Sequence, residues 1–239
     1  MMKKEMLVGC SSFNNRYWKG IFYPENIPAS KWFDYYCQYF DTYEFNGSFY
    51  KPPTVKIFEN WYNKVPEHFI FSVKAPKEIT HIKKFTDCQE LISDFYTICD
   101  TGLKDKLGCV LFQFPPSYSF TEERLHNIIS NLNPKFENVI EFRHVSWWID
   151  EVWDLFMKNN ITFCSVSHLQ LPETIFDTFP LVYIRLHGTP RMFYSGYSSE
   201  QLENIKNKAE GKNAFVYFNN TASEEGILNA LEFKKIINR

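Results

Sequence analysis

The sequence predicts a single (β/α)₈ barrel, and three observations indicate this fold. The 239 residues are close to the roughly 250 that are typical of such barrels. Short apolar runs alternate with segments of helical period, as expected for parallel β/α units. Polar residues gather where the predicted strands end, which is where these barrels carry their chemistry. No linker or repeat divides the chain, so we expect one domain over residues 1–239.

Eight short apolar runs, rich in β-branched and aromatic residues, are the predicted strands. They are 7–12, 42–48, 69–76, 107–115, 138–144, 161–167, 181–188 and 213–220. Segments with helical period lie at 29–40, 54–65, 88–103, 122–132, 150–159, 199–209 and 224–237. The sixth unit, 169–180, contains Pro172 and Pro180, so we expect its helix to be short or irregular.

Three helix starts carry a hydroxyl residue followed three positions later by Glu or Gln, which is the pattern of a capping box. The predicted pairs are Thr86 with Gln89, Ser198 with Gln201, and Thr221 with Glu224.

Composition narrows the class of protein. The net charge of −2 provides no global field for gathering nucleic acid or an anionic membrane. The sequence has neither the apolar run of a signal peptide nor an uncharged apolar stretch of about 20 residues. The six cysteines are scattered without a CxxC pair, so we interpret them as thiols in a reducing compartment and expect a cytoplasmic protein.

Charged and amide side chains end most of the predicted strands. Because side chains alternate with period two, Glu141 shares a face with Arg143, and Arg185 shares one with His187. The same spacing relates Glu44 to Asn46 and Tyr217 to Asn219. The intervening residues are apolar and suit contact with helices: Phe45, Phe142, Leu186 and Phe218. The alternation therefore predicts a polar pocket at the barrel mouth, since buried charges need partners or a ligand.

Our leading hypothesis is an enzyme that acts by general acid/base chemistry on a small anionic, sugar-like substrate bearing a phosphate or carboxylate. Guanidinium groups bind such anions bidentately, so Arg143, Arg185 and Lys74 would hold the anion. Glu141 or Glu44 would be the general base. His187 or His81 would be the acid, because imidazole titrates near neutral pH.

Further substrate-binding residues complete the predicted site. They are Asn46, Gln113, Asn219, Asn220, Tyr217, Trp18 and Arg191. Trp18 and Arg191 belong to the aromatic loops 13–24 and 189–197, which would form a lid or simply cover the barrel. This hypothesis invokes no cofactor and no metal ion, and it does not distinguish a hydrolase from a lyase or an isomerase.

Three alternatives remain open. In the first alternative, the polar residues form only a structural ion network, for example Glu141 with Arg185 and Glu44 with Lys74. Alternatively, the protein would be a divalent-metal hydrolase or isomerase, with ligands drawn from Glu44, Glu141, His81 and His187. The third alternative is a non-catalytic barrel that binds a nucleotide or nucleic acid through basic and aromatic residues, namely Arg16, Lys19, Arg143, Arg185 and Arg191 with Tyr and Trp.

Spaced motifs along the whole chain resemble the YecE-like family of unknown function (DUF72). They are Gly9-x-Ser11, Trp18-x-Gly20-x-Phe22-Tyr23-Pro24, Asn46-x-Ser48-Phe49-Tyr50, Lys74-x-Pro76 with Ile79-Thr80-His81, Gln113-x-Pro115-Pro116, Glu141-Phe142-Arg143-His144-x-Ser146-Trp147, Arg185-x-His187-Gly188, Tyr194-Ser195-Gly196-Tyr197, and Tyr217 with Asn219-Asn220. The resemblance implies a (β/α)₈ barrel and leaves the reaction undefined.

Overall fold

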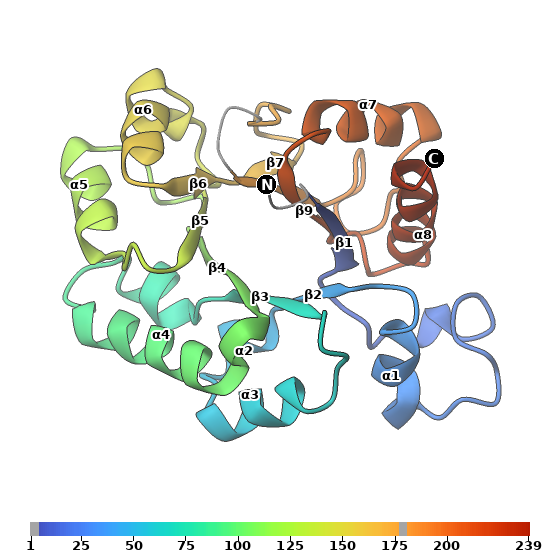
Figure 1. The fold of residues 1–239 in the computed structure, drawn as a ribbon. Coiled ribbons are helices and arrows are strands. Elements are labelled where there is room, and N and C mark those ends of the chain that lie inside the picture. The colour runs from blue at the N-terminus through green and yellow to red at the C-terminus, as the bar shows by residue number, and fades with distance from the viewer. Residues whose placement is uncertain (1–4, 177–180) are drawn as a thin grey trace. The chain divides into compact units, whose positions relative to one another are not determined.

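The strands form two parallel sheets (Figure 1). The computed structural model describes residues 5–176 and 181–239. One sheet has four strands in the order β1-β9-β8-β7, and the other has five in the order β2-β3-β4-β5-β6. The strands are β1 Met6–Cys10, β2 Thr42–Phe45, β3 Ile70–Lys74, β4 Leu107–Gln113, β5 Glu137–Glu141, β6 Ile161–Phe163, β7 Ser165–Ser167, β8 Leu181–Leu186 and β9 Asn213–Phe218.

Two compact units make up the chain. The first runs to Glu44 and resumes at Ser165, and the second spans Phe45–Cys164. The prediction of one closed eight-stranded domain stays a prediction, whereas the α/β class with parallel sheets is confirmed.

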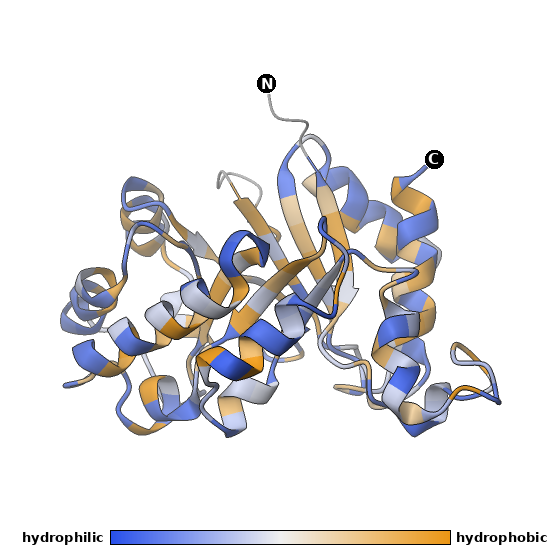
Figure 2. Cartoon of the chain, turned by 60° about the horizontal axis from the view of Figure 1, so that its bottom comes forward, coloured by the Kyte–Doolittle hydropathy of each residue, from blue (hydrophilic) through white to orange (hydrophobic). Residues whose placement is uncertain are grey.

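The α-helices are α1 Trp32–Tyr36, α2 Gly47–Tyr50, α3 Val55–Tyr62, α4 Gln89–Leu103, α5 Glu122–Asn131, α6 Asp150–Lys158, α7 Ser199–Ala209 and α8 Glu225–Ile237. Short 3₁₀ turns lie at Arg16–Trp18, Ala29–Lys31, Lys104–Lys106 and Val145–Trp147, and a π-helix lies at Glu78–Ile82. Hydrophobic and hydrophilic residues share the same helices in Figure 2, as amphipathic helices require.

All eight predicted strand segments contain a strand, and all but the sixth end two or three residues earlier than predicted. The sixth is divided at Cys164 into β6 and β7. The second stops at Phe45, because the following residues turn into α2. The predicted helix 29–40 is a 3₁₀ turn followed by the short α1. In the predicted sixth unit, the described residues 168–176 form no helix, and 177–180 lie outside the described residues.

One of the three predicted capping boxes is confirmed. Ser198 accepts the backbone N–H of Gln201, and the Gln201 side chain accepts the backbone N–H of Ser198. The box at Thr86 is wrong because that residue lies in an irregular turn, and α4 starts later without a side-chain cap. The box at Thr221 is also wrong, since the Ser223 hydroxyl accepts the Glu225 backbone N–H instead.

In the first unit, the four-stranded sheet fixes the register of the polar strand ends. Arg185 on β8 pairs with Tyr217 on β9, one residue before each strand ends. Phe218, which has the opposite orientation from Tyr217, packs against Phe233 of α8 with ring centroids 6.0 Å apart. The predicted alternation is therefore confirmed here: apolar residues contact helices, and the polar set occupies the other face.

The second unit shows the same alternation around an aromatic core. Phe142 stacks on Trp147 with centroids 3.9 Å apart and an angle of 5° between the ring planes. Phe45 packs edge-on against Phe58 of α3 at 5.3 Å. Both positions were predicted to face helices. The neighbouring Glu141 and Arg143 consequently face away from this aromatic core.

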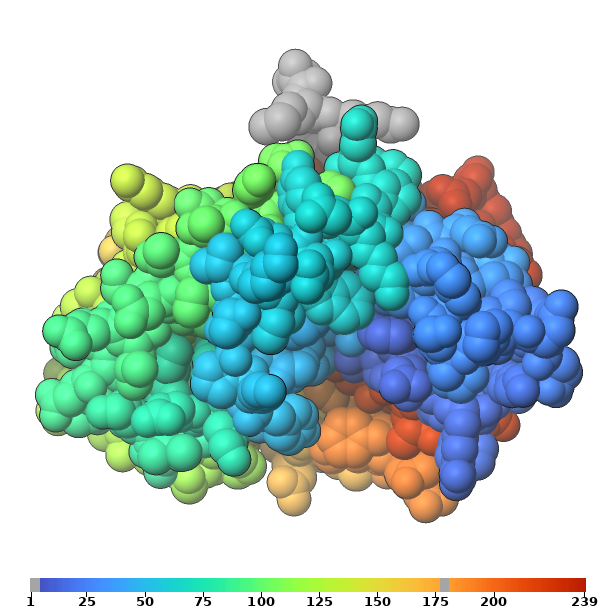
Figure 3. Space-filling model, turned by 90° about the horizontal axis from the view of Figure 1, so that it is seen from below, coloured from blue at the N-terminus to red at the C-terminus, as the bar shows by residue number. Residues whose placement is uncertain are grey.

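Helices α3 and α4 of the second unit meet at a glycine, on the surface that Figure 3 shows in blue-green to green. A Cβ atom on Gly102 would lie 2.5 Å from the Phe58 Cβ and 3.0 Å from the Val55 carbonyl oxygen. Neither atom belongs to a flexible side-chain end, so a larger residue requires the two helices to separate.

We therefore predict that Gly102→Ala destabilises the protein by about 1–3 kcal/mol, because the overpacking exceeds the roughly 1 kcal/mol that alanine gains over glycine within a helix. Urea unfolding provides the measurement. The adjacent exposed position supplies the control, since Thr101→Ala should change stability by no more than about 0.5 kcal/mol. Equal stability of the two variants would contradict the close helix contact.

Candidate functional site

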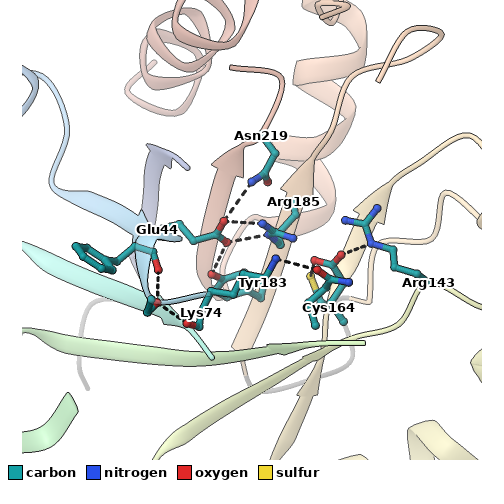
Figure 4. A network of polar contacts seen from close by, with 11 residues as sticks. Glu44, Lys74, Arg143, Cys164, Tyr183, Arg185 and Asn219 are labelled. Atoms are coloured by element: carbon teal, nitrogen blue, oxygen red, sulfur yellow. Dashed lines mark hydrogen bonds and ion pairs between the residues drawn. The ribbon is translucent and has the colours of Figure 1, made fainter. Parts of the chain in front are cut away.

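A buried ion pair organises the polar strand ends of the first unit (Figure 4). Glu44, at 0% exposure, accepts two hydrogen bonds from the guanidinium of Arg185, from Nε at 2.9 Å and from Nη2 at 2.8 Å. The Tyr183 hydroxyl donates at 2.8 Å and the Asn219 amide nitrogen at 3.1 Å. These bonds bring together groups from β2, β8 and the end of β9.

The bidentate contact defines what Arg185 does in this unit. Its guanidinium fork, predicted to bind a substrate anion, is occupied by the carboxylate of Glu44. Glu44 in turn is surrounded by donors. This arrangement has the geometry of a structural charge pair, in which each partner compensates the burial of the other.

Two asparagine oxygens stand out beside this pair. Asn219 donates its amide to Glu44, and Asn220 donates its amide to the Ser195 carbonyl at 3.0 Å. These donations fix the direction of each side chain. Among the described residues, the Oδ1 atoms of both are buried and accept no hydrogen bond. Both oxygens can therefore accept hydrogen bonds from hydroxyl or amine groups.

Of the remaining predicted residues of the first unit, three are packed into its interior and Arg191 is not. His187 is 2% exposed and contacts the Phe193 ring edge-on at 5.8 Å. The Tyr217 hydroxyl bonds to Thr42 Oγ1 at 2.5 Å. Trp18 is completely buried, and its indole donates to the Ser223 carbonyl at 2.8 Å. Arg191 is exposed and lies 4.1 Å from the centroid of the Tyr194 ring.

A second polar cluster lies at the carboxyl ends of strands in the second unit. Lys74 ends β3, and its Nζ donates to Gln113 Oε1, at the end of β4, over 2.8 Å. The same ammonium group lies 4.1 Å from the centroid of the Phe49 ring. Gln113 is oriented by its own amide, which donates to the Phe114 carbonyl at 2.7 Å. The lysine is thus held by an amide and an aromatic face.

The next strand contributes a carboxylate and a guanidinium (Figure 4). Glu141, at 0% exposure, accepts a hydrogen bond from Nε of Arg143, whose side chain is 10% exposed. The Cys164 thiol lies 3.9 Å from the other oxygen of Glu141 and donates to it. The carboxylate therefore orients Arg143.

His81 joins this cluster from the π-helix that follows β3. Its Nδ1 lies 2.9 Å from the Thr80 hydroxyl, and its ring meets Phe49 edge-on at 4.9 Å. Burial, together with the charges of Lys74, Arg143 and Lys84, lowers the pKa of His81 to about 4, and the charge of Glu141 opposes this shift. At neutral pH the imidazole is therefore uncharged and can accept a proton.

The sequence brings the members of this second cluster together for a simple reason. Lys74, Gln113 and Glu141 end three adjacent parallel strands, and the carboxyl ends of such strands meet at one edge of the sheet. Asn46 lies just beyond β2 and is half-buried. The predicted residues thus occur in two sets, Glu44 with Arg185 and Asn219 in one unit, and Lys74 with Gln113, Glu141, Arg143 and His81 in the other.

Three contributing residues were missing from the predicted site. Tyr183 has the same parity as Arg185, and this alternation was the signal that could have found it. Cys164 was interpreted only as one of six thiols in a reducing compartment, and its place beyond the break after β6 directs it to Glu141. Phe49 was noted only as part of a motif, because no local pattern indicates that its ring meets both Lys74 and His81.

Neither a metal-binding cluster nor a membrane-spanning helix occurs in the part of the chain that the structure describes. No group of three or more His, Cys, Asp or Glu residues is arranged to hold a metal ion. No helix is long and apolar enough to cross a membrane. All six cysteines are free thiols.

Comparison with known proteins identifies the relatives of this chain. Residues 7–239 match the family model described as "Protein of unknown function DUF72". The chain is 24% identical over 254 residues to the UPF0759 protein YunF of Bacillus subtilis, and this alignment covers 90% of this chain and 89% of YunF. It is 26% identical over 110 residues to the UPF0759 protein YecE of Escherichia coli, covering 46% of this chain and 40% of YecE.

Solved structures agree with the family match. The crystal structure of a DUF72 family protein from Thermotoga maritima superimposes with a TM-score of 0.88 at 27% identity, covering 98% of this chain and 99% of the other. A DUF72 family protein from Enterococcus faecalis has a TM-score of 0.82 at 20% identity, covering 98% and 96% of the two chains, and shows the shared fold.

We predict that Arg185→Met lowers the free energy of unfolding by about 3–5 kcal/mol, because the fully buried Glu44 then loses its cationic partner. In urea unfolding, the double variant Glu44→Gln/Arg185→Met should lose less than the sum of the two single variants. Arg191→Met, at an exposed position, is the control and should change stability by no more than about 0.5 kcal/mol. Strict additivity would contradict a coupled pair.

A second prediction concerns pH. In the folded protein the pKa of His81 is lowered from its ordinary value of 6.5 to about 4. Between these two pH values the unfolded chain therefore binds a proton at this histidine, and the folded protein does not. Stability should therefore fall as the pH drops through this window and be unaffected by His81 above it. Urea unfolding at pH 7 and pH 5 measures the loss, which should be smaller for His81→Gln. An identical loss in both proteins would show that His81 titrates normally.

Proposed function

Because this chain belongs to the DUF72 family of proteins of unknown function, its activity has to be inferred from its own residues, and we propose that it is an enzyme of the (β/α)₈ class acting on a small anionic substrate. The substrate class is a phosphorylated or carboxylated, sugar-like molecule. The chemistry is general acid/base catalysis. One feature carries the proposal: a half-buried histidine, whose pKa is lowered by burial and by neighbouring cations, lies beside the carboxyl ends of parallel strands.

The electrostatics of the second unit favour an anion. Four charged residues influence His81, and three of them, Lys74, Arg143 and Lys84, are cations. Arg143 is oriented by Glu141 and Lys74 by Gln113, so both cations are held in defined positions before a ligand arrives. Oriented cations bind phosphate or carboxylate with little loss of side-chain freedom.

His81 is the proposed proton acceptor. A group whose pKa lies below the working pH is already deprotonated, so a neutral imidazole suits the role of a base better than that of an acid. This revises the role expected from the sequence, in which His81 or His187 would donate a proton. Glu141 then acts by positioning Arg143, because its two oxygens are engaged by the guanidinium and the Cys164 thiol.

The polar residues of the first unit are proposed to have two different roles. Asn219 and Asn220 are the proposed ligands for hydroxyl groups, because their buried oxygens are aimed by the bonds that their amides donate. Glu44 and Arg185 are proposed to maintain the geometry around Asn219. His187 remains a candidate acid, and Trp18 and Tyr217 are proposed to support the surrounding structure through their buried hydrogen bonds.

A thermal-shift screen of phosphate, sugar phosphates and sugar acids tests the proposal. A ligand at ten times its Kd stabilises the folded state by about 1.4 kcal/mol, or roughly 3–5 °C for a chain of this size. We expect the wild type and the control Lys77→Met, at an exposed position, to respond equally. Lys74→Met should lose the response to sugar acids, which carry no phosphate, and should give a smaller shift than the wild type with the phosphate compounds. His81→Gln should retain binding but lose the turnover of any substrate that the screen identifies.

Other outcomes of the same screen discriminate the alternatives. Stabilisation only by divalent cations would favour the metal-dependent hydrolase or isomerase. Stabilisation only by nucleotides or oligonucleotides, weakening steeply with salt, would favour the non-catalytic barrel. An anion response that is identical in Lys74→Met would rule out the proposed anion site.

A further inference from the structure

A separate basic pocket lies in the second unit between the turn that follows the π-helix and the start of α5. Its volume is about 300 Å³. The lining residues are Lys83, Lys84, Thr86, Tyr118, Glu123, Arg124 and Asn127. Three are cations and one is an acid, so the lining carries a net charge of +2. None of these residues belongs to the proposed anion site around Arg143, although the charge of Lys84 reaches His81.

The three cations are held by neutral oxygens. Lys83 Nζ donates to the Asp87 carbonyl at 3.1 Å, and Lys84 Nζ donates to Ser117 Oγ at 3.3 Å. Arg124 Nη1 donates to the carbonyl of Ser119 at 2.7 Å and to its hydroxyl at 3.1 Å. In the described part of the chain, none of these three half-buried cations forms an ion pair with a carboxylate. Partly desolvated cations without a counter-ion favour an anionic ligand.

Tyr118 supplies a buried donor to the same pocket. The residue is 2% exposed, and its hydroxyl makes no hydrogen bond with the described residues. Arg124 Cζ lies 4.8 Å from the centroid of the Tyr118 ring. Burial is the main cause that raises the pKa of Tyr118 to about 12, and the charge of Arg124 opposes it. The phenol therefore stays protonated at neutral pH and can donate its hydrogen.

The backbone beside the pocket is strained and anchored. Lys84, Phe85 and Asp87 have positive φ angles of 51°, 64° and 44°, a conformation that is unfavourable for residues other than glycine. The turn is held by Phe85, which is completely buried, and by Asn127 of α5, whose amide donates to the Phe85 carbonyl at 2.8 Å. Strain of this kind is characteristic of functional sites. Here the strained residues include Lys84, which lines the pocket together with Lys83 and Arg124.

We propose that this pocket is a second binding site, specific for a phosphate group, in which Lys83, Lys84 and Arg124 bind the phosphate oxygens and the Tyr118 hydroxyl donates a hydrogen bond. The ligand class is a small phosphate or phosphate monoester, because three cations around one pocket match its charge and several oxygens. The site goes beyond the proposed function and does not depend on it.

Titration calorimetry with inorganic phosphate tests the site, with sodium chloride at equal ionic strength as the reference. The titrations are made in wild type and in Lys74→Met, so that binding at the proposed anion site is removed in the second series. We expect saturable phosphate binding to persist in Lys74→Met. In that background, Tyr118→Phe and Arg124→Gln should each weaken binding about tenfold, the effect of losing one hydrogen bond to a charged group. Glu123→Gln should tighten it.

The Tyr118→Phe variant also separates a binding role from a structural one. Because the hydroxyl has no partner among the described residues, its removal should leave Tm in phosphate-free buffer unchanged or raised. Lys77→Met serves as the matched charge control and should bind phosphate like its parent. The proposal is overturned if Lys74→Met shows no saturable phosphate binding, if Tyr118→Phe and Arg124→Gln bind normally, or if Tyr118→Phe lowers Tm in phosphate-free buffer.

Discussion

At the polar ends of these strands, the main constraint is that every buried carboxylate needs hydrogen-bond donors. Glu44 and Glu141 are both completely inaccessible to solvent, and each has an arginine within hydrogen-bonding distance in its own unit. Taking an isolated carboxylate out of water costs several kcal/mol, so the surrounding donors must be correctly placed for these strands to fold as they do. The positions of Tyr183, Asn219 and Cys164 follow from this constraint, because each completes the coordination of one of the two carboxylates.

The same constraint separates residues that look alike in the sequence. Arg185 and Arg143 both lie near strand ends, and both are near a glutamate. Arg185 binds its carboxylate through both Nε and Nη2. Arg143 accompanies Lys74 and Lys84 as one of three cations that lower the pKa of His81. This difference is why we assign anion binding to the second unit and a positioning role to the pair in the first.

Irregular backbone contributes as much to the candidate sites as the strands do. The π-helix after β3 brings His81 to Lys74, and the three left-handed residues that follow bring two lysines to α5. π-helical turns and strained residues are uncommon, and both occur preferentially where a structure has a function. One short segment, 78–87, therefore serves both the proposed anion site and the phosphate pocket, while the aromatic core beneath it, including Phe85, holds its shape.

The sequence alone determined the α/β class, the strand segments and which residues of each strand face the helices, because these depend on periodicity and on the apolar character of adjacent residues. It also determined the family and the polar residues at the strand ends. Only the tertiary structure decided that Glu44 binds Arg185, that Thr86 and Thr221 cap no helix, and that Tyr118, Lys84 and Arg124 line one pocket. Pairing between side chains distant in sequence, backbone strain and the pKa of His81 depend on packing and local electric field, which no short stretch of sequence contains.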